Sequence, residues 1–142
     1  MQEGIVPDTW WRHEDVGNNQ EAKKEILELF TNEEPYSTPK PTRLINRMLR
    51  ISTNPDSSDI VLDFFAGSGT TAHSALQLNR DDDGNRKFIM VQLPEPTGYP
   101  DYPSIAGIGK ERIRRVIEKL HEGDASQLRS EDAPPQDGAL RS

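Results

Sequence analysis

The feature that most constrains the fold is a strand, a glycine turn and a helix start in immediate succession within residues 59–72. The apolar run before Asp63 is typical of a parallel strand covered on both faces, and Asp63 stands where that strand ends. Gly67 and Gly69 let the backbone turn sharply and approach a ligand that a Cβ atom would exclude. The N–H groups of the following helix point back at the same place. This order predicts an α/β fold with a loop that binds a nucleotide-type cofactor.

The residues after the glycines narrow the choice of cofactor. A P-loop carries a lysine after its last glycine, whereas Thr70 and Thr71 follow Gly69, so a triphosphate site is not favoured. Segment 67–72 does match the G-x-G-x-x-A form of a dinucleotide turn, which keeps a nicotinamide-dependent Rossmann oxidoreductase fragment as an alternative. That alternative predicts a pyrophosphate at the start of the helix.

The sequence around this loop extends the pattern in both directions. An acid, two aromatics and Ala-Gly-Ser-Gly-Thr-Thr resemble the S-adenosylmethionine loop of β-class amino-methyltransferases. Residues 8–118 as a whole resemble the modification (Mod) subunit of type III restriction-modification systems, which is a β-class DNA adenine-N6 methyltransferase. The segments that carry the resemblance are 15–25, 36–45, 63–71, 78–95 and 111–117.

The resemblance implies a partial Rossmann-like methyltransferase fold, with the C-terminal half of the parallel sheet and its flanking helices. In the family, the acid of the loop and the Lys-Pro segment lie at the methionine end of S-adenosylmethionine, while the glycines make room for it. Many nucleotide-binding folds place an acid near the ribose, and the matching position is a glutamine here. The residues expected to bind this cofactor are Lys40, Pro41, Asp63, Phe65, Ala66, Gly67, Gly69, Thr70 and Gln92.

One motif of the family does not occur in the 142 residues: an Asp-Pro-Pro-Tyr or Asn-Pro-Pro-Tyr tetrapeptide. In the family this motif holds the target amino group and stacks on the extruded base. Neither Glu-Pro-Tyr at 34–36 nor Pro-Pro-Gln-Asp at 134–137 replaces it. Because β-class enzymes carry the tetrapeptide before the cofactor segments, we interpret the chain as the cofactor-binding portion. We assign no catalytic residue to it and expect it to be inactive alone.

The resemblance also implies partners. They are double-stranded DNA, the missing N-terminal methyltransferase half, a second modification subunit and a restriction subunit. A non-enzymatic alternative is a remnant that only associates with a partner protein or DNA and binds no small molecule. Residues 37–52 carry four bases and no acid, and they form either a DNA-facing basic surface or a helix with solvated arginines.

Composition limits the chemistry. The chain has no cysteine, which excludes the thiolate needed for cytosine carbon-5 methylation, whereas amino-group methylation needs no covalent intermediate. The three histidines show no metal-ligand spacing, so no metal site is expected. A net charge of −7 argues against a protein that coats nucleic acids. No apolar run is long enough for a membrane span, and the cytoplasm is the default location.

Three parts are expected along the chain: an acidic helical segment at 1–35, the S-adenosylmethionine-binding portion at 36–121 and a disordered acidic tail at 122–142. Acidic residues and a glycine predict a turn at 81–85. Two parallel strands at 60–64 and 88–93 make a poor sheet by themselves, so they need further strands or a dimer partner. A last helix is expected to present a basic outer face made of Lys110, Arg112, Arg114 and Arg115.

Overall fold

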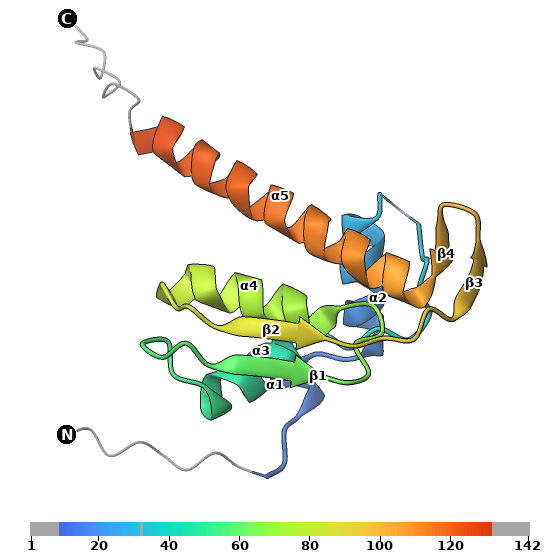
Figure 1. Cartoon of the computed structure of the whole chain (residues 1–142). Helices are drawn as coiled ribbons and strands as arrows, with labels where there is room; N and C mark the ends of the chain where they lie inside the picture. The colour runs from blue at the N-terminus through green and yellow to red at the C-terminus, as the bar shows by residue number, and fades with distance from the viewer. Residues whose placement is uncertain (1–8, 32, 132–142) are drawn as a thin grey trace, which may run out of the picture.

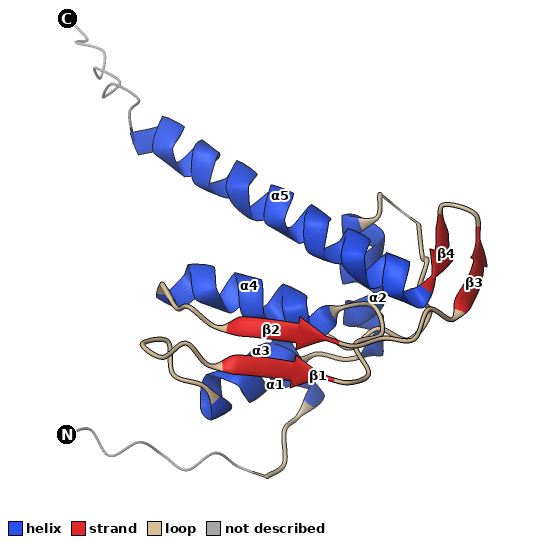
Figure 2. Cartoon of the chain, viewed as in Figure 1, coloured by secondary structure: helices blue, strands red, loops and turns tan. Residues whose placement is uncertain are grey.

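The computed structural model describes residues 9–31 and 33–131, with side chains described as far as residue 124. It shows a mixed α/β arrangement in which helices lie on one side of a small parallel sheet (Figures 1 and 2). The elements in chain order are α1 (His13–Val16), α2 (Asn19–Leu29), α3 (Thr42–Ser52), β1 (Ile60–Asp63), α4 (Thr70–Asp82), β2 (Lys87–Met90), β3 (Pro96–Tyr99), β4 (Tyr102–Ser104) and α5 (Ile105–Glu131).

The centre of the fold is the unit β1-α4-β2. The two strands pair in parallel, with Val61 opposite Phe88, and α4 supplies the crossover that parallel neighbours require. Val61 and Phe88 pack against the buried side chains of Leu49 on α3 and Ala75 and Leu78 on α4. The predicted strand-helix-strand order is therefore present, and its core lies between the sheet and these two helices.

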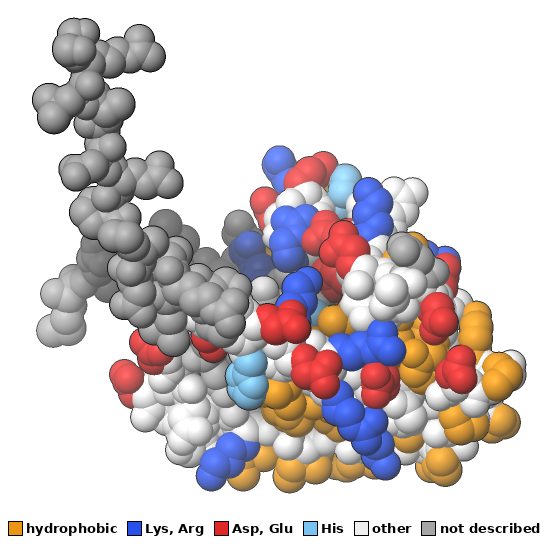
Figure 3. All heavy atoms as spheres, turned by 90° about the horizontal axis from the view of Figure 1, so that it is seen from above, with side chains coloured by type: hydrophobic (Ala, Val, Ile, Leu, Met, Phe, Trp, Pro, Cys, Tyr) orange, Lys and Arg blue, Asp and Glu red, His pale blue; other side chains and the backbone are white. Residues whose placement is uncertain are grey.

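The opposite face of the sheet differs from its prediction. The sequence predicted a strand covered on both faces, but the described residues cover only one. In the view from above, hydrophobic side chains gather along the lower margin, the side on which the strands lie in front of the helices in Figure 1 (Figure 3). The exposed apolar side chains of the two strands and the residues that follow them are Ile60, Leu62, Phe64, Ile89, Val91 and Leu93.

A second core joins α2 to α5. Ile26, Phe30 and Ile108 are buried together, and the rings of Phe30 and Tyr102 meet edge to face with centroids 5.4 Å apart. Tyr102 belongs to β4, which pairs antiparallel with β3 in a hairpin just before α5. The proline-rich sequence did not predict this hairpin. It places the start of α5 next to α2 (Figure 1).

Two element boundaries differ from expectation. α4 continues to Asp82, so the turn predicted at 81–85 is shorter and starts at Asp83, which has a left-handed φ of 52°. α5 continues to Glu131, so the first ten residues of the expected disordered tail are helical. Their composition explains this, since Ala, Gln, Leu and Arg favour helix and the first proline follows only at 134. The rest of that tail lies outside the described residues.

Within the part of the chain that the structure describes, no helix is both long and apolar enough to cross a membrane. The same residues contain no group of three histidine or acidic side chains that could hold a metal ion.

Candidate functional site

Asp63 connects the end of β1 to the start of α4. One carboxylate oxygen accepts a hydrogen bond from the backbone N–H of Phe65 at 3.0 Å, and the other accepts from the Thr71 hydroxyl at 2.6 Å. Each oxygen keeps a lone pair for a ligand. The carboxylate therefore shapes the loop and still faces the space beside it.

The loop turns at its two glycines. Gly67 and Gly69 have φ values of 51° and 78°, a region that residues with a side chain rarely adopt. A Cβ atom on Gly67 would lie 2.8 Å from the Tyr36 hydroxyl, and one on Gly69 would lie 3.1 Å from the carbonyl oxygen of Gly109. The backbone N–H of Gly67 donates to the Gln92 side-chain oxygen at 2.8 Å. The close approach of neighbouring segments therefore requires glycine at both positions.

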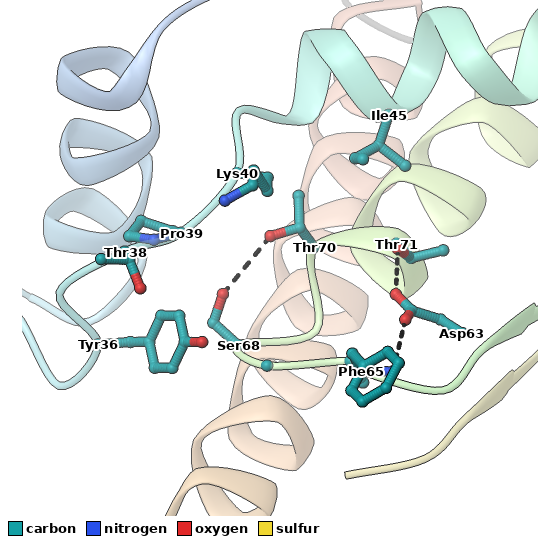
Figure 4. A pocket seen from close by; sticks show the side chains of 12 residues that line it. Tyr36, Thr38, Pro39, Lys40, Ile45, Asp63, Phe65, Ser68, Thr70 and Thr71 are labelled. Carbon is teal, nitrogen blue, oxygen red and sulfur yellow. Dashed lines mark hydrogen bonds between the residues drawn. The ribbon is translucent and has the colours of Figure 1, made fainter.

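A cavity of about 170 Å³ opens on one side of this loop. Figure 4 shows Lys40, on the chain before α3, across the cavity from Asp63 and Phe65. Phe65 is almost fully exposed, at 91%. The residues that line the cavity are Tyr36, Thr38, Pro39, Lys40, Ile45, Asp63, Phe65, Ala66, Gly67, Ser68, Thr70 and Thr71.

A second cavity, of about 330 Å³, shares Ala66 and Gly67 with the first. The loop thus separates two adjoining hollows. The sequence predicts four of the residues that line the second cavity, Ala66, Gly67, Gly69 and Gln92, but not the residues that α5 contributes. The lining residues are Ala66, Gly67, Gly69, Met90, Gln92, Pro94, Ala106, Gly109, Lys110 and Ile113.

The structure brings eight of the nine nominated residues to these two cavities. Pro41 is the exception: it is buried at the N-cap of α3, and Pro39 lines the cavity in its place. The proline of the Lys-Pro pair therefore supports the helix start, while Lys40 beside it is exposed.

A buried arginine lies beneath the loop. Arg112 of α5 is fully buried, which contradicts the expected basic outer face of this helix. Its guanidinium donates to the Ser68 hydroxyl at 3.0 Å, to the Thr70 hydroxyl at 2.9 Å and to His73 Nδ1 at 3.3 Å. Glu25 of α2 forms an ion pair with it at 3.6 Å. The position follows from helix geometry, because Ile108 and Val116, four residues away on either side, share the same buried stripe.

Burial dominates the electrostatics of this group. It lowers the pKa of Arg112 to about 10, although the Glu25 charge opposes that change. Burial, with the positive charge of Arg112 as the next cause, lowers the pKa of His73 to about 3, so the ring is neutral and Nδ1 accepts from Arg112. Burial also raises the pKa of Glu25 above its usual range, against the hydrogen bonds from Thr42.

Comparison with known proteins identifies the family. A family model for DNA methylases of the N6 and N4 type matches residues 1–118. The chain belongs to this DNA methylase family. This membership confirms the methyltransferase class and leaves the nicotinamide-dependent oxidoreductase without support.

Several relatives of this DNA methylase chain are type III enzymes. The StyLTI Mod subunit of Salmonella typhimurium is 41% identical over 113 residues, which is 75% of this chain and 17% of the relative. The EcoP15I Mod subunit of Escherichia coli is 38% identical over 105 residues, 69% of this chain and 16% of the relative. The EcoPI Mod subunit of Escherichia phage P1 is 43% identical over 90 residues, 59% of this chain and 14% of the relative. The resemblance to type III modification subunits is confirmed, and the chain spans only a small part of their length.

The arginines of the basic segment 37–52 contact other parts of the chain. Arg43 binds both carboxylate oxygens of Glu21, at 2.6 and 2.8 Å, and the guanidinium of Arg47 lies 5.2 Å from the centre of the Trp11 ring. Arg50 forms an ion pair with Asp81 at 3.5 Å. These arginines hold α3 to its neighbours, so the structure does not favour the DNA-facing basic surface that the charge pattern left open.

Proposed function

We propose that this chain is the S-adenosylmethionine-binding portion of a site-specific DNA adenine-N6 methyltransferase, and that β1-α4-β2 belongs to a Rossmann-like sheet. The observation that carries the proposal is the first cavity, where Asp63 and Lys40 line opposite sides of a hollow beside a glycine loop. The methionine end of the cofactor carries an ammonium group, a carboxylate and a sulfonium. Asp63 suits the two cations and Lys40 suits the carboxylate.

The second cavity suits the adenosine end. Met90, Ala106 and Ile113 offer apolar surface for a flat base, and few polar groups are present to fix its orientation, as is usual for small-molecule sites. The Gln92 side-chain oxygen is occupied by the N–H of Gly67, but its amide nitrogen has two hydrogens, one of which donates to the Leu93 carbonyl. The second hydrogen is available for a ribose hydroxyl.

When bound, S-adenosylmethionine supplies an electrophilic methyl group on its sulfonium. The residues of this chain bind and orient the cofactor: Asp63 and Lys40 hold its methionine end, and the backbone at Gly67 and Gly69 allows close approach. We assign no proton transfer to them. The groups that hold the adenine amino group lie in the missing tetrapeptide, so we propose that residues outside this chain supply them.

The exposed face of the sheet supports a partner of this kind. Six apolar side chains of β1, β2 and the residues after them lie open on one surface, which is unusual for a protein that acts alone. Both strands also have an unpaired edge within the described structure. We propose that the N-terminal methyltransferase half covers this face, and that the assembled enzyme binds double-stranded DNA together with a second modification subunit and a restriction subunit. Residues 36–121 would form the cofactor portion in that assembly.

Isothermal titration of the 142-residue chain tests the cofactor assignment. We expect saturable binding of S-adenosylmethionine and S-adenosylhomocysteine but not of NAD. Asp63→Ala should weaken binding by roughly 10- to 100-fold, because a charged hydrogen bond is lost. Asp59→Ala is the matched control, since Asp59 precedes the same strand, accepts from the N–H of Asn54 and lines neither cavity. A folded chain that binds none of the three ligands would instead support the non-catalytic remnant.

A further inference from the structure

α5 contacts the glycine loop through two residues on one of its faces. Gly109 is buried against the loop backbone, and a Cβ atom there would lie 3.2 Å from the carbonyl oxygen of Gly67. Arg112, one turn further along, donates to the hydroxyls of Ser68 and Thr70. Residues three apart lie on the same face of a helix, so both residues of α5 reach the same loop. Gly109 allows close backbone approach, and Arg112 supplies a charged hydrogen-bond donor.

Glu25 carries the same network to the opposite wall of the first cavity. Its carboxylate pairs with Arg112 and also accepts from Thr42, from the hydroxyl at 2.8 Å and from the backbone N–H at 3.2 Å. Thr42 begins α3, directly after Lys40 and Pro41. A single carboxylate therefore contacts the start of α3 and the arginine beneath the loop.

The location of Arg112 is electrostatically unfavourable, which argues that it is not there for stability alone. A cation at a helix N-terminus opposes the helix dipole, and the hydroxyl of Thr70 that Arg112 contacts belongs to the first residue of α4. A buried ion pair also costs desolvation energy that its attraction repays only in part. A methionine would fill much of the same space without either cost.

We propose that Arg112 and Glu25 are positioning residues that hold the two walls of the cofactor cavity in register, the glycine loop through Ser68 and Thr70 and the Lys40 segment through Thr42. The proposal rests on the assignment of S-adenosylmethionine to this cavity. Neither residue lines the cavity, so both act through the residues they hold. Loss of either residue should make both walls more mobile and weaken the binding of a ligand that contacts both walls.

Amide hydrogen exchange of the full chain without ligand tests the coupling. In Arg112→Met we expect exchange to rise about 10-fold or more both at residues 66–70 and at the distant Thr42 amide, which donates to Glu25. Arg86→Met is the matched control, because Arg86 is also a buried arginine but lies at the other end of α4. There the increase should stay near residues 79–87. Unchanged exchange at Thr42 in Arg112→Met would overturn the proposal.

Ligand titration separates positioning from a loss of stability. In the proposed site S-adenosylhomocysteine would span both cavities, whereas 5′-methylthioadenosine lacks the amino-acid end that the first cavity would hold. Arg112→Met should raise the Kd of the first about 10-fold and that of the second less than about 3-fold, since a smaller folded fraction alone would weaken both equally. Equal weakening would overturn the proposal.

A second variant covers the case in which the single substitution unfolds the chain. Glu25→Leu/Arg112→Met removes both charges together, which proteins tolerate better than one unpaired buried charge. It should remain folded and show the same exchange and the same difference between ligands. If Arg112→Met raised exchange at both walls while the wild type bound neither ligand, the cofactor assignment would be wrong, but the coupling of the two walls would be supported.

Discussion

The two ends of α4 are built alike but differ in electrostatics. At the C-terminal end, Arg86 is buried, pairs with Asp82 at 2.8 Å and donates to the Thr53 hydroxyl at 2.7 Å. At the N-terminal end, Arg112 is buried, pairs with Glu25 and donates to the Thr70 hydroxyl. Each end therefore has one arginine, one carboxylate and one threonine.

The charges favour one end and oppose the other. Arg86 lies at the negative end of the helix dipole and lowers the pKa of Asp82 by its hydrogen bond, so this pair is stabilising. Arg112 lies at the positive end, and burial raises the pKa of its partner Glu25. The C-terminal pair follows ordinary helix energetics, whereas the N-terminal pair keeps a costly arrangement next to the candidate cofactor loop. This contrast agrees with the proposed positioning role of the N-terminal pair, in addition to its part in stability.

The largest effect is expected when the N-terminal pair is broken on one side only. Arg112→Met should lower the free energy of unfolding by about 3–5 kcal/mol, because the largely buried Glu25 carboxylate loses its charged partner. Glu25→Leu/Arg112→Met should recover much of that loss, since no buried charge remains. Urea denaturation of both variants measures the difference. If the double variant were as unstable as the single one, desolvation would not be the main cost at this end.

Breaking the C-terminal pair should have a smaller effect. Arg86→Met removes charged hydrogen bonds to Asp82, whose pKa is lowered by the Arg86 hydrogen bond rather than raised by burial, and we expect a loss of about 1–3 kcal/mol. The Kd of S-adenosylhomocysteine should not change for the folded protein, because this end is far from both cavities. Urea denaturation and ligand titration of the same sample report both quantities. A rise in Kd like that of Arg112→Met would mean that the two ends of α4 do not act separately.

The residues of the loop could be predicted because their signal is local. Asp63, Gly67 and Gly69 stand at fixed spacings between a strand and a helix, and each has a chemical reason to be there. Lys40 came from the family pattern instead. All four lie at the cavities, which were therefore accessible to sequence reasoning together with the resemblance.

The support beneath the loop could not be predicted in the same way. Arg112 stands among other bases, so its charge suggested an outward face, while its spacing of four from Ile108 and Val116 pointed inward. That spacing is the signal that would have found it. Nothing local connects Glu25 to Arg112, because their contact depends on how α2 and α5 pack. The apolar wall that Ala106 and Ile113 form likewise depends on a tertiary contact, that of α5 with the glycine loop.

Acid should also distinguish the two ends. The pKa of His73, lowered to about 3 by burial and by Arg112, lies well below the value near 6.5 in an unfolded chain. The unfolded state therefore binds more protons between these values, and stability falls as the pH is lowered. From pH 7 to pH 5 we expect His73 to cost about 1–2 kcal/mol.

His73→Asn isolates this contribution, because it keeps a hydrogen-bond acceptor and removes the titrating ring. Its unfolding free energy should fall less than that of the wild type between pH 7 and pH 5. The raised pKa of Glu25 works in the opposite direction in both proteins, so the difference between them is the quantity to compare. Arg86→Met should keep the wild-type slope. Equal slopes for His73→Asn and the wild type would show that the ring takes up its proton without unfolding.

The smallest effect comes from single hydroxyls, and it gives the sharpest comparison. Thr70→Val and Thr53→Val each remove one acceptor of a buried arginine, and each should cost about 1 kcal/mol of stability. Only Thr70→Val should also raise the Kd of S-adenosylhomocysteine, since only Thr70 lines the cavity. The same denaturation and titration applied to both variants would therefore separate a residue that supports the helix from one that also shapes the site. Equal effects of the two variants on the Kd would contradict the conclusion that only the N-terminal end of α4 contributes to the cofactor site.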